Sequence, residues 1–250
     1  MLGALASLAA NPILRHGASS YFLAKAPLTA ALHYLMALAS VLFVIWPKSQ
    51  FLRVGSPPLT FSIEAIVATL IMAYLSFSYG AGKFGDEIAQ VSPQAIIGQG
   101  LARRGAVVGL TVLTIGHTLF FVVLALPLLV AAAHVSGISL ENFGRALLLI
   151  VICTLAYRWL GLFTLCVWET QDFMRYVVAR AAFVVIVVGS AFFFPASNPL
   201  LGLISMTFGE ELRQVVLVNG HELSYATVTL IIHLLLLLAA YIMVVKLLKY

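Results

Sequence analysis

The sequence predicts an all-α integral membrane protein with six transmembrane helices and an interfacial amphipathic helix near its N-terminus. Apolar residues make up 62% of the 250 residues and charged residues 9%, whereas a soluble domain carries roughly 25% charged residues. The mean hydropathy of +1.08 indicates the same class. The apolar residues form long continuous runs, and these exclude the short alternating strands of a membrane β-barrel.

Six apolar runs are long enough to cross a bilayer, which takes about 20 mostly apolar residues in an α-helix. We expect the spans at residues 28–46, 63–79, 105–133, 146–168, 179–194 and 226–245. The chain then divides into an N-terminal segment, residues 1–27, and a six-span domain, residues 28–250. Residues 195–225 form the longest outer loop, which we expect to cap the bundle.

The N-terminal segment contains a short amphipathic pattern. Apolar Leu14, Tyr21 and Phe22 are interleaved with Arg15 and other polar residues, so a helix would place one face in lipid and the other among the headgroups. We therefore expect an interfacial helix. A disordered tail is the alternative, because Gly17 weakens a helix and the apolar stripe is short.

Lysine and arginine are unevenly distributed between the two sides of the predicted bundle. If the N-terminus is inside, the outer basic residues are four, Lys48, Arg53, Arg145 and Arg213. The inner ones are nine, Arg15, Lys25, Lys83, Arg103, Arg104, Arg175, Arg180, Lys246 and Lys249. Because cytoplasmic loops retain positive charge, we expect both termini in the cytoplasm and the chain in the inner (cytoplasmic) membrane. The pI of about 9.4 then reflects topology, and no nucleic-acid partner is expected.

The inner segment between spans two and three, residues 83–104, is much longer than a minimal loop. Acids lie near its start and a proline follows, as in a helix that begins, breaks and starts again on the membrane surface. A solvated loop without a partner is the alternative. The residues expected to contact a partner are Asp86, Glu87, Pro93, Gln94, Ile96 and Ile97.

Several ionisable residues lie within or near the predicted spans. Arg158 is in span four, where an arginine costs about 2.5 to 3.5 kcal/mol on insertion scales. We expect it to face the bundle interior or water, as a translocation-pathway or subunit-interface residue, unless it reaches the interface by extending its side chain. His33, His117 and His233 are expected to hydrogen-bond neighbouring helices, with His117 a second pathway candidate. Glu64, near the outer end of span two, is expected to be interfacial rather than buried.

No enzymatic site is readable in the sequence. It contains no GxxxxGK[ST] loop to bind phosphates, and no paired carboxylates or Ser-His-Asp arrangement. Cys153 and Cys166 lie in one apolar run without CxxC spacing or clustered histidines, so neither a metal site nor a disulfide is indicated. We expect a protein that is not an enzyme and binds no cofactor itself.

The order of several short motifs resembles the permease subunits of ABC-2 type exporters along most of the chain. These motifs are "NPILR" at residues 11–15, "SPQAIIGQ" at 92–99, "LGLFTLCVWE" at 160–169 and "SNPLLGLISMTFGEEL" at 197–212. Those permeases have six spans with both ends cytoplasmic. The segment from Glu87 to Pro93 is about half as long as is usual in the family, so this chain has a shortened coupling element.

The resemblance implies a coupling helix within residues 83–104 that contacts a separate ABC ATPase subunit, which binds ATP and Mg²⁺. It also implies a second permease subunit, identical or related, and export by alternating access. The nearly uncharged spans favour a lipid-like or amphipathic substrate. The alternative is a membrane scaffold or assembly subunit that transports nothing.

Overall fold

The computed structural model describes residues 10–46, 59–82, 102–168, 171–208, 214–218 and 220–248. Six of its helices are long and apolar enough to cross a membrane, which confirms the prediction of a multi-pass, mostly helical protein. The spans are α3 (Lys25–Ile45), α4 (Leu59–Gly80), α7 (Arg103–Ser136), α8 (Leu140–Val167), a fifth composed of α9 (Asp172–Phe183), η3 (Val184–Gly189) and α10 (Ser190–Phe193), and α12 (Tyr225–Leu247).

Shorter elements flank these spans. The N-terminal helix consists of α2 (Pro12–Ala18) and the π-helical η1 (Ser19–Leu23). Spans five and six are joined by η4 (Pro195–Ser197), α11 (Pro199–Phe208) and a hairpin of β1 (Val215–Val218) and β2 (His221–Ser224). The strands are antiparallel, with Val215 opposite Ser224 and Val218 opposite His221. Residues 195–225 thus contain a helix whose inner face, including Gly202 and Leu203, is buried against the bundle.

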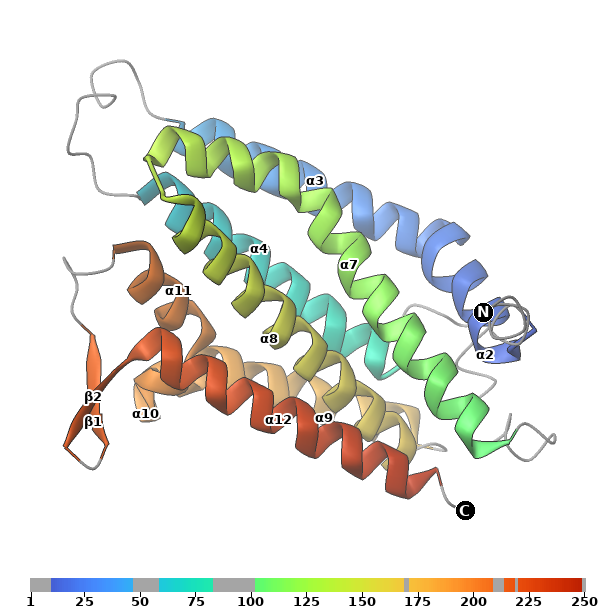
Figure 1. Cartoon of the computed structure of the whole chain (residues 1–250). Coiled ribbons are helices and arrows are strands. Elements are labelled where there is room, and N and C mark those ends of the chain that lie inside the picture. The colour runs from blue at the N-terminus through green and yellow to red at the C-terminus, as the bar shows by residue number, and fades with distance from the viewer. Residues whose placement is uncertain are drawn as a thin grey trace, which may run out of the picture.

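Helices α4 and α8 lie together in the middle of the bundle (Figure 1). Helix α7 packs against both of them, α3 covers α4 and α7, and α12 covers α8 from the other side. The N-terminal helix packs on α7. Helix α2 and the end of α12 lie at one end of the bundle, which we call the α2 end, and the hairpin lies at the other (Figure 1).

Basic residues gather at the α2 end. Among the described residues, the terminal turns at that end and the segments beside them contain Arg15, Lys25, Arg103, Arg104, Arg175 and Lys246, and Arg180 lies about two turns into α9. At the hairpin end the described basic residue is Arg145. Arg103 also ties two spans together, because its Nη2 donates to the carbonyl of Val245 in the last turn of α12 at 2.6 Å.

Two Asn-Pro pairs start short helices in the same way. The Oδ1 of Asn11 accepts from the N–H of Ile13 at 3.0 Å, and the proline that follows occupies the first position of α2. The Oδ1 of Asn198 accepts from the N–H groups of Leu200 and Leu201. Such caps satisfy backbone donors that a helix leaves unpaired. Each asparagine also donates to another element, Asn11 to the carbonyl of Gly105 in α7 and Asn198 to that of Val187 in η3.

Glycines allow α4 and α8 to touch backbone to backbone near the α2 end. A Cβ on Gly80 would lie 2.5 Å from the carbonyl oxygen of Arg158 and 2.7 Å from the Cα of Gly161. A Cβ on Gly161 would lie 2.6 Å from the carbonyl oxygen of Phe77. Gly82, with φ of +83°, follows the end of α4 in a left-handed conformation that glycine adopts readily.

The expectation that Glu64 is interfacial rather than buried is wrong about its burial. Its side chain is 0% exposed, and neither carboxyl oxygen has a hydrogen-bond partner in the described part of the chain. The reason is the position of α4, which is covered by α3, α7, α8, α9 and α11. A residue one turn from the end of such a helix is buried by neighbouring helices, although its depth along the span is near the interface.

We predict that Gly161→Ala destabilises the bundle by about 1 to 3 kcal/mol, because the added methyl group overlaps the backbone of α4. Gly144→Ala is the matched control on the same helix, since nothing lies within 4 Å of a Cβ there. Denaturant unfolding in mild detergent measures both variants. Equal stability of the two variants would contradict the close contact of α4 with α8.

Candidate functional site

The guanidinium group of Arg158 lies inside the bundle between two tyrosine rings. The side chain is 2% exposed. Its Cζ atom is 4.5 Å from the ring centroid of Tyr21, on η1, and 5.4 Å from that of Tyr79, in the last turn of α4. Both distances are within the range of a cation–π contact. Arg158 therefore faces the bundle interior, as expected. Three elements, α8, η1 and α4, meet at its charge.

This charge has no anionic partner in the described part of the chain. No carboxylate lies within ion-pair distance of Arg158, and its Nε and Nη1 are buried without a hydrogen-bond partner there. Glu64 is near the end of α4 opposite Tyr79, about 20 Å from Tyr79 along the helix axis at 1.5 Å per residue. A desolvated cation–π contact contributes about 2 kcal/mol, so two rings offset much of the insertion cost of an arginine.

His117, the second residue expected from the sequence, belongs to the same site. Its ring centroid is 4.5 Å from that of Tyr79 and 5.1 Å from that of Tyr21. The ring is buried, and its Nε2 has no hydrogen-bond partner among the described residues. The imidazole therefore packs by its faces and edges instead of bonding a neighbouring helix. We call Arg158, Tyr21, Tyr79 and His117 the arginine cluster.

The cluster is close to the start of the inner segment. Tyr79 is followed within a few residues by Gly82, the last residue described before that segment. The hydroxyl of Tyr21 donates to the carbonyl of Tyr79 at 3.4 Å, and that of Tyr176, on α9, donates to the carbonyl of Gly82 at 3.4 Å. The exit of α4 is thus held by the N-terminal helix, by α8 through the glycine contact and by α9.

The predicted coupling residues Asp86, Glu87, Pro93, Gln94, Ile96 and Ile97 lie outside the described residues. The described residues that flank this part of the chain are Gly82, after α4, and Ala102, just before α7. Both are at the α2 end of the bundle. The contacts of the segment itself stay a prediction from the sequence.

A second polar network joins α8 to α12 and α12 to η4. The Nδ1 of His233 is 2.9 Å from the carbonyl of Thr229, and because a carbonyl only accepts, Nδ1 carries the proton. The Nε2 is then an acceptor, and the hydroxyl of Tyr157 donates to it at 2.6 Å. The hydroxyl of Thr229 donates to the carbonyl of Ala196 at 2.8 Å. His233 thus bonds a neighbouring helix, as the sequence predicts.

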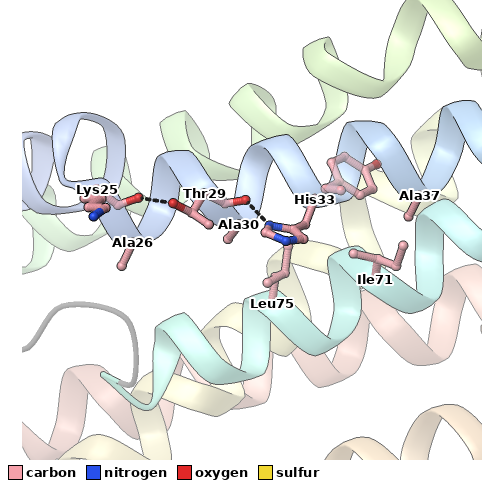
Figure 2. A pocket seen from close by; sticks show the side chains of 9 residues that line it. Lys25, Ala26, Thr29, Ala30, His33, Ala37, Ile71 and Leu75 are labelled. Carbon is pink, nitrogen blue, oxygen red and sulfur yellow. Dashed lines mark hydrogen bonds between the residues drawn. The ribbon is translucent and has the colours of Figure 1, made fainter.

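His33 behaves differently from the other two intramembrane histidines. Its Nδ1 donates to the carbonyl of Thr29 on its own helix at 2.7 Å. The ring lies in a groove of about 760 Å³ between α3 and α4, where it faces Leu75 (Figure 2). The groove begins at Lys25 and passes Ala30 and Ala37 along α3.

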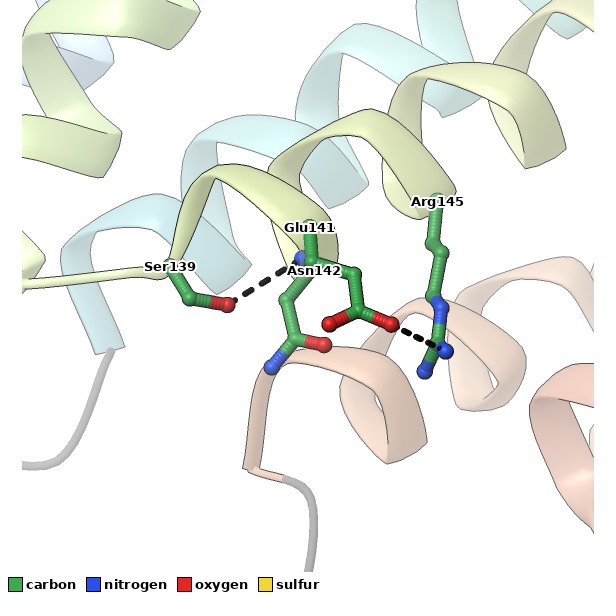
Figure 3. Close-up of polar contacts among 4 residues, drawn as sticks. All are labelled: Ser139, Glu141, Asn142 and Arg145. Atoms are coloured by element: carbon green, nitrogen blue, oxygen red, sulfur yellow. Dashed lines mark hydrogen bonds and ion pairs between the residues drawn. The ribbon is translucent and has the colours of Figure 1, made fainter.

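A polar cavity of about 870 Å³ lies at the hairpin end. It is bounded by α8, α11, the hairpin and α12, and its lining includes Asn142, Arg145, Gln214 and Glu222. Figure 3 shows the start of α8, where the Oγ of Ser139 accepts from the N–H of Asn142 at 3.2 Å and Arg145 pairs with Glu141 one turn earlier. The arginine at this end is thus exposed and paired, in contrast to Arg158.

Sequence reasoning missed the two tyrosines that complete the arginine cluster. Tyr79 ends an apolar run, and Tyr21 lies in the N-terminal segment, so neither is marked by charge. Tyr21 was expected only on an apolar helix face toward lipid, yet its ring is buried in the bundle. A buried arginine without an acid nearby in the sequence is the one signal that could have prompted a search for aromatic partners.

Comparison with known proteins identifies no relative, because no family model, no curated protein and no solved structure matches the chain. Among the described residues, no group of three or more His, Cys, Asp or Glu side chains is placed to hold a metal ion.

We predict that Arg158 and Tyr21 are energetically coupled. In a double-mutant cycle of Arg158→Met and Tyr21→Leu, the coupling energy for unfolding should be about 1 to 2 kcal/mol, because each substitution alone already removes the shared cation–π contact. Methionine is used since it keeps most of the arginine volume.

The control cycle pairs Arg158→Met with Phe22→Leu. Phe22 is the neighbour of Tyr21 on the same segment and contacts His117 and Phe120. Its coupling to Arg158 should be below about 0.5 kcal/mol. Coupling energies of the same size in both cycles would refute a specific contact with Tyr21.

Proposed function

We propose that this chain is the transmembrane permease subunit of an ATP-driven ABC exporter, related to the ABC-2 type. The observation that carries the proposal is the arginine cluster at the point where α4 leaves the bundle toward the inner segment. Ionisable residues within membrane spans are expensive and mark functional sites. The charge of Arg158 lies where η1, α4 and α8 meet. A push from the inner segment would displace these three elements.

The cluster can transmit such a push by direct contact. Movement of the last turn of α4 displaces Tyr79, and the guanidinium group that lies against Tyr79 also lies against Tyr21. The backbone contact of Gly80 with Gly161 carries the same movement into α8. A motion of the inner segment would therefore shift α4, α8 and the N-terminal helix together. Close contacts thus connect the last turn of α4, which leads into the inner segment, to α8 and the N-terminal helix. Coupling between them would require that the elements move together between two conformations.

The proposed assembly contains two permease subunits and two ATPase subunits, with ATP and Mg²⁺ bound by the latter. The second permease is another copy or a related chain. Exposed apolar side chains such as Phe43, Phe192 and Phe193 provide surfaces for lipid or for that subunit. The excess of basic residues at the α2 end supports an orientation with both termini in the cytoplasm, in the inner membrane.

The proposed substrate is lipid-like or amphipathic. Support comes from the apolar character of the spans and from the polar cavity at the hairpin end, which could hold a headgroup while an apolar part stays in the bilayer. The coupling role goes to Asp86, Glu87, Pro93, Gln94, Ile96 and Ile97, and the pathway or interface role to Arg158 and His117.

A non-transporting scaffold remains the second candidate, favoured by one observation. Neither of the two large cavities is lined by Arg158 or His117. The cluster residues are buried, and neither of these cavities gives a route past them in the described part of a single copy. Under the first proposal the route forms between two copies or in a second conformation, whereas a scaffold needs no route.

The deciding experiment reverses the acids of the inner segment. In Asp86→Lys, Glu87→Lys, Ile96→Gln, we expect ATP hydrolysis to continue without transport, because buried aliphatic contacts worth about 1.5 to 3 kcal/mol each and the charges that set their register are lost. Glu141→Lys at the hairpin end is the control and should leave coupling unchanged.

Cross-linking separates the two candidates. A cysteine at Gln94 should cross-link to a nucleotide-binding subunit in native membranes, in a yield that changes between ATP-free and ATP-trapped conditions. Failure to cross-link under either condition would reject the permease proposal, and capture of a partner without a nucleotide site would favour the scaffold.

A further inference from the structure

The groove between α3 and α4 has a charged entrance and an apolar interior. Lys25 lies at its α2 end, and the walls further along consist mainly of Ala26, Ala30, Ala37, Ile71 and Leu75. The alanines follow one face of α3 (Figure 2), and their side chains are small. The groove opens at the side of the bundle, where lipid surrounds a membrane protein.

Two polar side chains of the groove, Thr29 and His33, are paired along α3, whereas the hydroxyl of Tyr34 is buried without a hydrogen-bond partner among the described residues. The hydroxyl of Thr29 donates to the carbonyl of Lys25 at 2.8 Å, and the Nδ1 of His33 donates to the carbonyl of Thr29 at 2.7 Å. The described part of the chain places no carboxylate within ion-pair distance of the Lys25 ammonium group. Among the described residues the groove therefore has a cation without an acidic partner at its entrance and mostly apolar surface beyond it.

We propose that this groove binds an acyl chain of an anionic phospholipid from the leaflet at the α2 end, with the lipid phosphate at Lys25. From Lys25 to Ala37 the helix rises about 18 Å at 1.5 Å per residue, which matches the roughly 15 Å of hydrocarbon in one leaflet of a 30 Å core. The volume of about 760 Å³ is within the usual range for small-molecule sites, about 300 to 1,000 Å³.

Charge complementarity favours a lipid over a helix from a second copy. The acidic side chains that the structure describes, Glu64, Glu141 and Glu222, lie at the hairpin end, so none of them could reach Lys25 of a neighbouring copy at the same depth. An apolar helix in the groove would cover the ammonium group, and none of these three described acids would pair with it, which costs free energy. A phosphate at headgroup level pairs with it directly.

This inference does not depend on the proposed function, because a bound lipid is compatible with a permease and with a scaffold alike. Its test is a binding measurement on the purified full-length chain in nanodiscs. The probes are phosphatidylglycerol and phosphatidylcholine, each with a photoreactive diazirine near the end of one acyl chain, followed by mapping of the labelled peptides.

We expect phosphatidylglycerol to label α3 near Ala37 and α4 near Ile71 about fivefold more than phosphatidylcholine does, the preference that one lysine near the headgroups provides. Lys25→Gln should abolish the preference, and Ala37→Phe should reduce labelling by both lipids. Lys246→Gln, which removes an exposed lysine at the same end, and Met36→Phe, on the exposed face of α3, are the controls and should change neither.

Three outcomes would overturn the proposal. They are equal labelling at Met36 and Ala37, an unchanged lipid preference in Lys25→Gln, and a disulfide between two copies carrying Ala37→Cys, which would show that a helix fills the groove. If Ala37→Phe fails to fold, Ala30→Leu blocks the same groove with a smaller side chain and is read in the same way.

Discussion

The structure depends most on one interaction, the guanidinium group of Arg158 between the rings of Tyr21 and Tyr79. The bundle buries this charge away from solvent, and the described part of the chain supplies no carboxylate to neutralise it. The faces of the two tyrosine rings are the described groups that stabilise the charge of Arg158. Because the two rings come from the N-terminal helix and from the end of α4, stabilising the charge fixes both elements against α8.

Close backbone approach makes this arrangement possible. Lipid is as apolar as the helix surfaces, so helices associate through packing and hydrogen bonds more than through hydrophobic burial. Gly80 and Gly161 bring α4 against α8, and Gly109 makes room for the Asn11 side chain on α7. Gly202 does the same for Thr229, whose hydroxyl bonds the carbonyl of Ala196. Glycine thus provides space for polar contacts to form between helices at several points of the bundle.

The six spans could be predicted because a run of apolar residues is a local property with a length set by the bilayer. The environment of single residues could not, because it depends on which helix is central. Glu64 shows this, since it is near the end of α4 and still buried by the helices around it. The burial of Arg158 followed from its cost in lipid. Its partners Tyr21 and Tyr79 come from sequence positions far apart, and periodicity does not link them.

The claim that Arg158 holds the N-terminal helix in the bundle is tested most directly by hydrogen–deuterium exchange in nanodiscs, comparing the wild-type chain with Arg158→Met. The account predicts faster exchange in α2 and η1, whose contact with the bundle loses its charged anchor, and unchanged exchange in α11 and the hairpin at the other end. Unchanged exchange in α2 and η1, with the variant inserted and folded, would contradict the account.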